Sequence, residues 1–404
     1  MHRIARLSAL VVGLFVAAGA QDAAAAQLKG AQEATVQDLP VDLVEEPYFI
    51  DPMKRATPWP VVAPPAEGQE AAEQMVPGRA GLGPWRLYEG TFDESSCRSP
   101  RLSQDATVLL SICRGLDPSR PGDEHVVLLQ DNRLHRYANP IAPLDVAGGA
   151  RVDLSMDGER FAVVIEEGAG RSIHIINLVL RTDTRVSGGW RNPGNPVLSA
   201  DVGAVGFTAE VAGRPAVIAV SLDDKKAWTA WHGGRRSRLA VYGVGPSGKR
   251  VLMTANLTDK DQLFLVDVSR NVYYDLSGDA GNVTSATLHR SAEAAVFTST
   301  IGGACGVFWV DLQGRKAKDF VGSVEVCYER AMLEDTRRYV LYEQVGLNKE
   351  RRVVLYDRKK KQTKQEMPAT CHDAHFSGDG QVMAARCNHN QTGWGVYLFA
   401  NPEE

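Results

Sequence analysis

One repeated pattern limits what this chain can fold into more than any other feature of the sequence. Seven segments each combine an apolar strand, a polar turn that often reads Ser-x-Asp-Gly, and a second apolar strand. Aligned on the turn serine, the equivalent residues are Ser103, Ser155, Ser199, Gly245, His289, Leu333 and Ser377. The intervals between them are 52, 44, 46, 44, 44 and 44 residues. Such a period is typical of a repeat fold.

Each repeat has room for four strands. Asp-Gly between two apolar runs predicts a two-residue hairpin turn, because Gly and Asp tolerate a positive φ. A second hairpin follows, and its first strand is strongly apolar, as in 126–129, 263–266 and 353–356. Four antiparallel strands per repeat form one blade of a propeller. We therefore predict an all-β fold, a seven-bladed β-propeller of four-stranded antiparallel blades.

The seventh repeat holds three strands before the sequence ends at Glu404. The missing strand has a candidate donor in residues 85–92, which alternate between apolar and polar side chains just before the first repeat. Pairing this segment with the last blade would close the ring and leave no open seam. The sequence thus predicts a propeller over 85–404 that is closed by an N-terminal strand.

The first 26 residues have the pattern of a signal peptide. His2, Arg3 and Arg6 precede an apolar run over 7–18, and small residues follow, with cleavage expected after Ala20 or Ala26. The alternative is an uncleaved N-terminal anchor, although the run is short for a spanning helix. We expect a periplasmic or secreted protein with no transmembrane segment after signal cleavage.

Residues 27–84 differ in composition from the rest. They hold nine of the twenty prolines, nine acidic residues and four basic residues. Proline fixes φ and removes a backbone donor, so the run 57–65 does not suit a sheet interior or a helix. We predict a Pro-rich acidic extension that is partly disordered. Its apolar islands at 48–50 and Trp59 could dock on the propeller or a partner, and a solvated tether is the alternative.

The six cysteines all follow residue 96 and form three pairs of sequence neighbours. Two pairs have the same place in their repeats, because one cysteine precedes the aligned serine by six residues and the other follows it by ten. Two strands folded back on that turn bring such positions side by side. The predicted disulfides are Cys97–Cys113, Cys371–Cys387 and Cys305–Cys327, the last joining neighbouring blades. Disulfides suit an oxidising compartment, and no Cys-x-x-Cys knuckle suggests zinc.

The repeat resembles that of TolB-type β-propeller proteins. The resemblance rests on the Ser-x-Asp-Gly turn, the apolar strand after it and a third strand ending in Asp-Leu, and it covers roughly residues 85–401. The propellers of prolyl-oligopeptidase-like enzymes carry a similar repeat. The chain lacks counterparts of the α/β domain of TolB and of the peptidases' hydrolase domain, so the resemblance implies the propeller fold alone.

Motifs for catalysis are absent from the sequence. There is no Gly-x-Ser-x-Gly nucleophile elbow and no phosphate-binding loop. Ser199-Ala-Asp-Val-Gly203 begins like a sialidase Asp-box, but the residues after it end the match. We therefore predict no catalytic residues and no cofactor.

One polar cluster lies in the last blade. His372, Asp373 and His389 are candidate ligands for a divalent ion, since imidazole suits zinc or copper. His372 and His375 should point to opposite faces of their strand, which weakens a three-histidine site. The alternative is an ordinary polar rim. The basic run Lys359-Lys-Lys361 is interpreted as a solvated hairpin turn.

The leading hypothesis is a non-catalytic cell-envelope or periplasmic binding or scaffold protein. It would be a monomeric propeller whose rim loops bind an envelope protein partner. The net charge of −4 argues against nucleic acid. The alternative is a secreted propeller enzyme, a polysaccharide lyase or hydrolase acting at the channel mouth, and a third hypothesis is an adhesion component. Convergent His, Asp, Glu or Arg side chains at that mouth would favour the enzyme. Apolar loop tips would favour binding of a protein partner.

Overall fold

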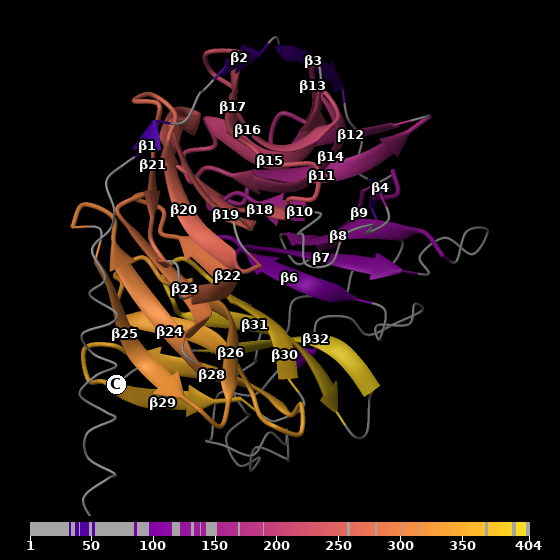
Figure 1. Cartoon of the computed structure of the whole chain (residues 1–404). Helices are drawn as coiled ribbons and strands as arrows, with labels where there is room; N and C mark the ends of the chain where they lie inside the picture. Colours follow the sequence, from indigo (N-terminus) through magenta and orange to yellow (C-terminus); the bar gives the residue numbers. More distant parts are fainter. Residues whose placement is uncertain are drawn as a thin grey trace, which may run out of the picture.

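The computed structural model contains seven antiparallel sheets, which stand around a common centre (Figure 1). It describes residues 32–33, 37–39, 41–47, 51–52, 85–86, 97–114, 122–130, 133–137, 139–142, 152–168, 170–188, 190–256, 259–278, 281–301, 303–314, 316–367, 371–389 and 393–400. The predicted signal peptide and most of the 27–84 extension lie outside these residues. Within the described ranges, no helix has the length and apolar content needed to span a bilayer.

The first four blades follow the predicted order. Blade 1 contains β6 (Arg98–Leu102), β7 (Val108–Arg114), β8 (Glu124–Gln130) and β9 (Arg133–Arg136). Blade 2 contains β10 (Val152–Leu154), β11 (Arg160–Glu167), β12 (Gly170–Asn177) and β13 (Thr182–Gly188). Blade 3 contains β14 (Arg191–Leu198), β15 (Ala204–Val211), β16 (Arg214–Ser221) and β17 (Lys226–His232). Blade 4 contains β18 (Leu239–Val244), η2 (Pro246–Gly248), β19 (Arg250–Asn256), β20 (Asp261–Asp267) and β21 (Val272–Asp275).

The last three blades complete the ring. Blade 5 contains β22 (Gly281–Leu288), β23 (Ala294–Ile301), β24 (Ala304–Asp311) and β25 (Lys316–Ser323). Blade 6 contains β26 (Cys327–Leu333), β27 (Tyr339–Val345), β28 (Arg351–Asp357) and β29 (Gln362–Glu366). Blade 7 contains β30 (Cys371–Phe376), β31 (Val382–His389), β32 (Gly393–Ala400) and, from the N-terminal side, β5 (Trp85–Arg86). In that blade Trp85 pairs with Leu398 and Arg86 with Tyr397. The seven-bladed propeller and its closure by an N-terminal strand are confirmed.

The turn after each innermost strand explains why the repeat has its sequence. In blade 1 the Ser103 hydroxyl donates to Asp105 Oδ1 at 2.9 Å and accepts the Val108 amide at 3.0 Å. The residue three places after the aligned position, or four places after Leu333 in blade 6, is left-handed in every blade, with φ between 52° and 72°; these residues are Ala106, Gly158, Val202, Gly248, Ala292, Arg337 and Gly380. The turn is therefore longer than the two residues that Asp-Gly predicts.

The turn hydrogen bonds also correct one position of the alignment. Ser103 N donates to Val108 O, and the corresponding bond in blade 6 runs from Glu334 N to Tyr339 O. The aligned residue of blade 6 is thus Glu334 rather than Leu333. Its carboxylate accepts the amides of Thr336 and Tyr339, so it takes over the role of the serine.

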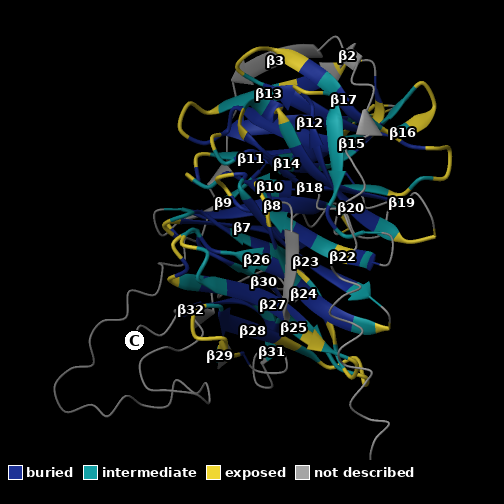
Figure 2. Cartoon of the chain, turned by 60° about the vertical axis from the view of Figure 1, so that its left-hand side comes forward, coloured by how far each residue is buried: buried dark blue, intermediate teal, exposed yellow. Residues whose placement is uncertain are grey.

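The core lies between blades. Seven clusters of buried apolar side chains each join two neighbouring blades. Figure 2 shows the strands mostly buried and the exposed residues gathered at the loop tips. Burying apolar strands against the next blade is what makes every repeat depend on its neighbours.

Four short segments of the N-terminal extension add strands to the outside of the ring (Figure 1). They are β1 (Gln32–Glu33), β2 (Gln37–Leu39), β3 (Val41–Pro47) and β4 (Asp51–Pro52). Each pairs antiparallel with the outermost strand of a blade: β1 with β21, β2 with β17, β3 with β13 and β4 with β9. The extension therefore passes blades 4, 3, 2 and 1 in turn before β5 joins blade 7.

The structure contains the three predicted disulfides. Cys97–Cys113 and Cys371–Cys387 each join the first two strands of a blade, with Cα atoms 4.0 Å apart. Cys305–Cys327 joins β24 of blade 5 to β26 of blade 6, with Cα atoms 4.8 Å apart. The two intrablade bridges have equivalent positions because their repeats are equivalent.

Candidate functional site

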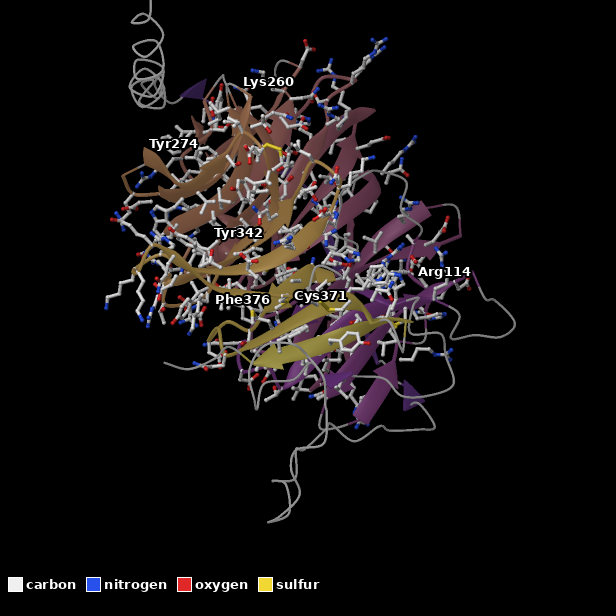
Figure 3. All side chains as sticks on the ribbon, turned by 90° about the horizontal axis from the view of Figure 1, so that it is seen from below. Arg114, Lys260, Tyr274, Tyr342, Cys371 and Phe376 are labelled. Atoms are coloured by element: carbon white, nitrogen blue, oxygen red, sulfur yellow. A yellow bond between two sulfur atoms is a disulfide. The ribbon has the colours of Figure 1, made fainter. Side chains whose placement is uncertain are left out.

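The innermost strands of all seven blades line a central cavity of about 780 Å³. We call the end at which these strands begin the inlet end and the other the turn end, because the Ser-x-Asp turns lie there. Strand β30 spans this length, and Figure 3 marks its two ends by Cys371 and Phe376. A channel of this kind is the usual ligand site of a rigid repeat scaffold.

Residues of four blades meet at the turn end. Gln104 N donates to Met156 O at 2.6 Å, and Asp335 N donates to Gly378 O at 2.8 Å. A Cβ atom on Gly378 would lie 2.9 Å from Met156 Cε and 3.0 Å from Gln104 Cγ. The side chains of blades 1 and 2 thus approach the backbone of blade 7 closely at Gly378.

The innermost strands carry β-bulges near the inlet end. Four places before the aligned turn residue, Ser99, Asn195, Arg330 and Asp373 have φ between 52° and 57°. Each lies where the pairing with the second strand shifts by one residue. Non-glycine residues in this conformation are uncommon, and bulges of this kind re-aim side chains next to functional sites. Three of the four lie in the adjacent blades 6, 7 and 1.

The bulges free backbone amides that then bind buried carboxylates. Ser99 N donates to Asp373 Oδ2 at 2.6 Å, which links blade 1 to blade 7. Asp373 N donates to Glu343 Oε1 at 2.6 Å, which links blade 7 to blade 6. The residues with positive φ and the buried carboxylates thus form one hydrogen-bonded network.

Arginines complete this network. Arg330 pairs with Asp373 and, at 3.5 Å, with Glu343 Oε1. Arg351 Nη1 lies 3.0 Å from Glu343 Oε2 and 2.8 Å from Glu329 Oε2. Two cations from one blade therefore hold the carboxylates at the boundary of blades 6 and 7.

Burial and charge have opposite effects on the two buried acids. Burial raises the pKa of Glu343, and Arg330 offsets only part of this effect. Burial would also raise the pKa of Asp373, but Arg330, Arg101 and the Ser99 amide outweigh it and hold that pKa below its usual range. Asp373 is consequently the firmly ionised member of the pair.

Further arginines surround the network. Arg98 Nη2 lies 2.6 Å from Glu124 Oε1, and the Arg386 guanidinium lies 4.8 Å from the centre of the Trp394 ring. The residues of blades 1, 6 and 7 that line the cavity include four arginines and three carboxylates: Arg98, Arg101, Arg330 and Arg386, and Glu329, Asp335 and Asp373. The excess of cations makes this wall positive, a setting that attracts anions.

Two histidines face the same cavity. His372 pairs with Arg386 and His375 with Ala384, positions two apart on β31, so both rings lie on one face of β30. The expectation that they point to opposite faces is wrong, because the bulge at Asp373 changes the alternation. Burial lowers the pKa of His375 to about 3 and also lowers that of His372. Both imidazoles are neutral near pH 7.

The candidate metal ligands have other partners where they are described. The Asp373 carboxylate pairs with Arg330 and accepts the Ser99 amide, and the Asp373 amide donates to Glu343. His372 packs edge-on against Trp394 at 4.9 Å between ring centres. The side chain of His389 lies outside the described residues. Among those described, no group of three or more His, Cys, Asp or Glu side chains is arranged to hold a metal ion.

The opposite wall, from blades 3 to 5, carries mostly uncharged groups, and its lining arginine, Arg290, is paired with Asp335 Oδ2 at 2.9 Å. Asn195 donates to Val241 O at 2.9 Å, and Thr287 donates to Ala331 O at 2.8 Å. Tyr242, Thr284 and Ser285 also line the cavity. The channel thus presents a cationic wall and a neutral hydrogen-bonding wall to the same space.

A second polar group lies outside the channel, in blade 2. Ser172 Oγ is 2.8 Å from His174 Nε2, and His174 Nδ1 is 2.7 Å from Asp183 Oδ1. This is the hydrogen-bond order of a serine hydrolase triad. However, Ser172 is only 4% exposed and Glu167 Oε1 also lies 3.1 Å from His174 Nε2. We interpret the group as a buried hydrogen-bond network.

Comparison with known proteins identifies the fold only. No family model matches the sequence, and no curated protein matches it. An oligogalacturonate lyase solved in complex with manganese aligns with a TM-score of 0.60 and 13% identity, over 92% of this chain and 99% of that one. Prolyl oligopeptidase B from Galerina marginata aligns with a TM-score of 0.55 and 12% identity, over 77% of this chain and 50% of that one.

TolB from Acinetobacter baumannii is also among the structures found. It aligns with a TM-score of 0.44 and 15% identity, over 76% of this chain and 80% of that one. The likenesses to the lyase and the oligopeptidase, with TM-scores above 0.5, show a shared fold. They do not assign the chain to the TolB family or to either enzyme family.

Proposed function

We propose that this protein is an exported binding propeller whose central channel takes up a small acidic saccharide at the inlet end. The observation that carries the proposal is the convergence of arginines from blades 1, 6 and 7 on one wall of the cavity, opposite a neutral wall. Arginine suits carboxylates, and amide and hydroxyl groups suit sugar hydroxyls. A cavity of about 780 Å³ has the volume of an ordinary small-molecule site.

Access and location fit this proposal. Because Arg98, Arg330 and Arg386 lie toward the inlet end, we place the ligand there and expect it to enter from that end. Three disulfides are consistent with an extracellular or periplasmic protein. Binding of an envelope protein by the rim loops stays a prediction, and we place the small-molecule site in the channel independently of it.

Isothermal titration calorimetry with trigalacturonate, and with a neutral trisaccharide as the control ligand, tests the proposal. We expect Arg98→Gln and Arg386→Gln each to weaken binding of the acidic ligand by about tenfold, since each removes a charged donor. Glu124 keeps Arg114 as a partner in Arg98→Gln, at 3.3 Å. Arg185→Gln, on the outer strand β13, is the matched control. Equal binding of both saccharides, or none of the acidic one, would contradict the proposal.

A second candidate, a lyase acting on the same ligand, is favoured by the neutral imidazole of His372 beside Arg386. The imidazole would accept the proton α to the carboxylate, and an arginine would stabilise the enolate charge. The β C–O bond then breaks to leave a conjugated double bond, and the leaving oxygen takes a proton from water. Ultraviolet absorbance of that product tests this candidate. His372→Asn should abolish turnover and retain binding, whereas absence of turnover in the unaltered protein would exclude the lyase and leave the binding proposal standing.

A further inference from the structure

The N-terminal extension covers the outer edges of only some blades. Blades 1 to 4 each gain a fifth strand, and β5 is the fourth strand of blade 7. Among the described strands, β25 and β29 are the outermost strands of blades 5 and 6 and have no strand beyond them. These two blades are neighbours in the ring, so the open edges lie on one side of the molecule.

An outermost strand offers a row of backbone N–H and C=O groups to an added strand. The chain already uses this mode of binding. Strand β3 pairs with β13 over seven residues, from Val41 opposite Gly188 to Pro47 opposite Thr182. The same antiparallel addition recurs at β9, β17 and β21. The outer edge of a blade in this protein is therefore a surface to which extended segments bind.

Lysine side chains give the outer edge of blade 6 a positive charge. Lys359 and Lys361 are exposed in the turn before β29. Lys364 lies on the strand itself, where it donates to the Tyr339 hydroxyl at 3.3 Å. Nearby, Glu366 lies 3.7 Å from Arg352, so this carboxylate has a cation of its own. The edge is consequently basic, whereas the segments that bind the other blades are acidic: Asp38, Asp42, Glu45 and Glu46 lie in β2 and β3.

We propose that the outer edge of β29 is a docking site for an extended acidic segment of a protein partner, which adds as a fifth strand to blade 6. Main-chain hydrogen bonds supply the pairing, and the exposed Lys359 and Lys361 select acidic side chains. This gives the lysine run, interpreted from sequence as a solvated turn, a role in recognition. This proposal does not depend on the channel site and is tested separately from it.

A peptide with the sequence of residues 37–47, carrying a photoreactive side chain and a fluorophore, is the probe. With the full-length mature protein we expect salt-sensitive binding by fluorescence anisotropy and crosslinks to residues 362–366. Lys359→Glu/Lys361→Glu should weaken binding by about tenfold, because two favourable surface charge contacts become unfavourable. A peptide with lysines in place of its aspartates and glutamates should not bind.

The matched control lies in blade 3. Lys225 and Lys226 are exposed in the equivalent turn, and the outer edge of their blade is already paired with β2. Lys225→Glu/Lys226→Glu should therefore leave peptide binding unchanged. The proposal is overturned if both double variants weaken binding equally, if the acidic peptide does not bind, or if crosslinks fall on β13 or β17 alone. Concentration-dependent dimers in sedimentation velocity that require residues 27–84 would assign the edge to a second copy instead.

Discussion

Single residues on β30 set the character of the channel wall. Asp373 is ionised because Arg330 and the Ser99 amide outweigh its burial, and two residues away His375 is neutral because burial dominates. The Nδ1 atom of His375 accepts the amide of Leu102 at 3.2 Å, so the neutral ring also ties blade 7 to blade 1. Protonation of this ring would cost both its burial and that hydrogen bond.

His375 makes the protein sensitive to acid. Its pKa falls from 6.5 to about 3 on folding, so between these values the unfolded state binds more protons and stability falls as pH falls. His375→Asn keeps an acceptor near the Nδ1 position and removes the titration. Between pH 7.5 and pH 4.5, urea unfolding should show the unaltered protein losing about 2–3 kcal/mol more than the variant. Parallel losses in the two proteins would show that His375 does not titrate in this way.

At the scale of strands, the space beside a glycine of an innermost strand differs from one blade to another. A Cβ atom on Gly243 of β18 would lie 2.2 Å from Leu288 Cβ of β22. On Gly194 of β14, the nearest atom to such a Cβ is Thr208 Oγ1, at 3.8 Å. Glycine is required at the first position by the packing of blade 4 on blade 5, and at the second position there is room for a methyl group.

This difference predicts the outcome of two matched substitutions. Gly243→Ala should destabilise the protein by about 2 kcal/mol, because the clash involves the base of the Leu288 side chain, which cannot move freely. Gly194→Ala should stay within about 0.5 kcal/mol of the unaltered protein. Denaturant unfolding of the two variants measures both values. Equal effects would mean that the blades adjust their spacing more readily than their packing indicates.

Much of the architecture could be predicted at this scale from the sequence, because strands, turns and disulfides repeat with the blades. The errors arose where a blade departs from the repeat. Glu334 replaces the turn serine and shifted one alignment by a residue, and the bulge at Asp373 put His372 and His375 on one face. The arginine wall was missed because it joins residues far apart in the sequence, such as Arg98 of blade 1 and Arg386 of blade 7.

The whole molecule is a ring that one N-terminal strand closes and four others partly encircle. Strand β5 completes blade 7, and β1 to β4 run along the outside of blades 4 to 1. Composition alone did not reveal the outer strands, because strand addition relies on backbone hydrogen bonds and needs no apolar pattern. The ring fixes the relative positions of blades 1, 6 and 7, and only that arrangement brings Arg98, Arg330 and Arg386 to one cavity.

Hydrogen–deuterium exchange of the full chain, with and without saturating trigalacturonate, tests the central claim most directly because it locates the ligand. A ligand at the inlet end of the channel should slow exchange in 98–102, 329–333 and 371–376, which contain the bulges and Arg98, Arg101 and Arg330 of the arginine wall. The neutral trisaccharide should leave these segments unchanged. Slower exchange confined to rim loops or outer strands, or no change at saturation, would contradict a channel site.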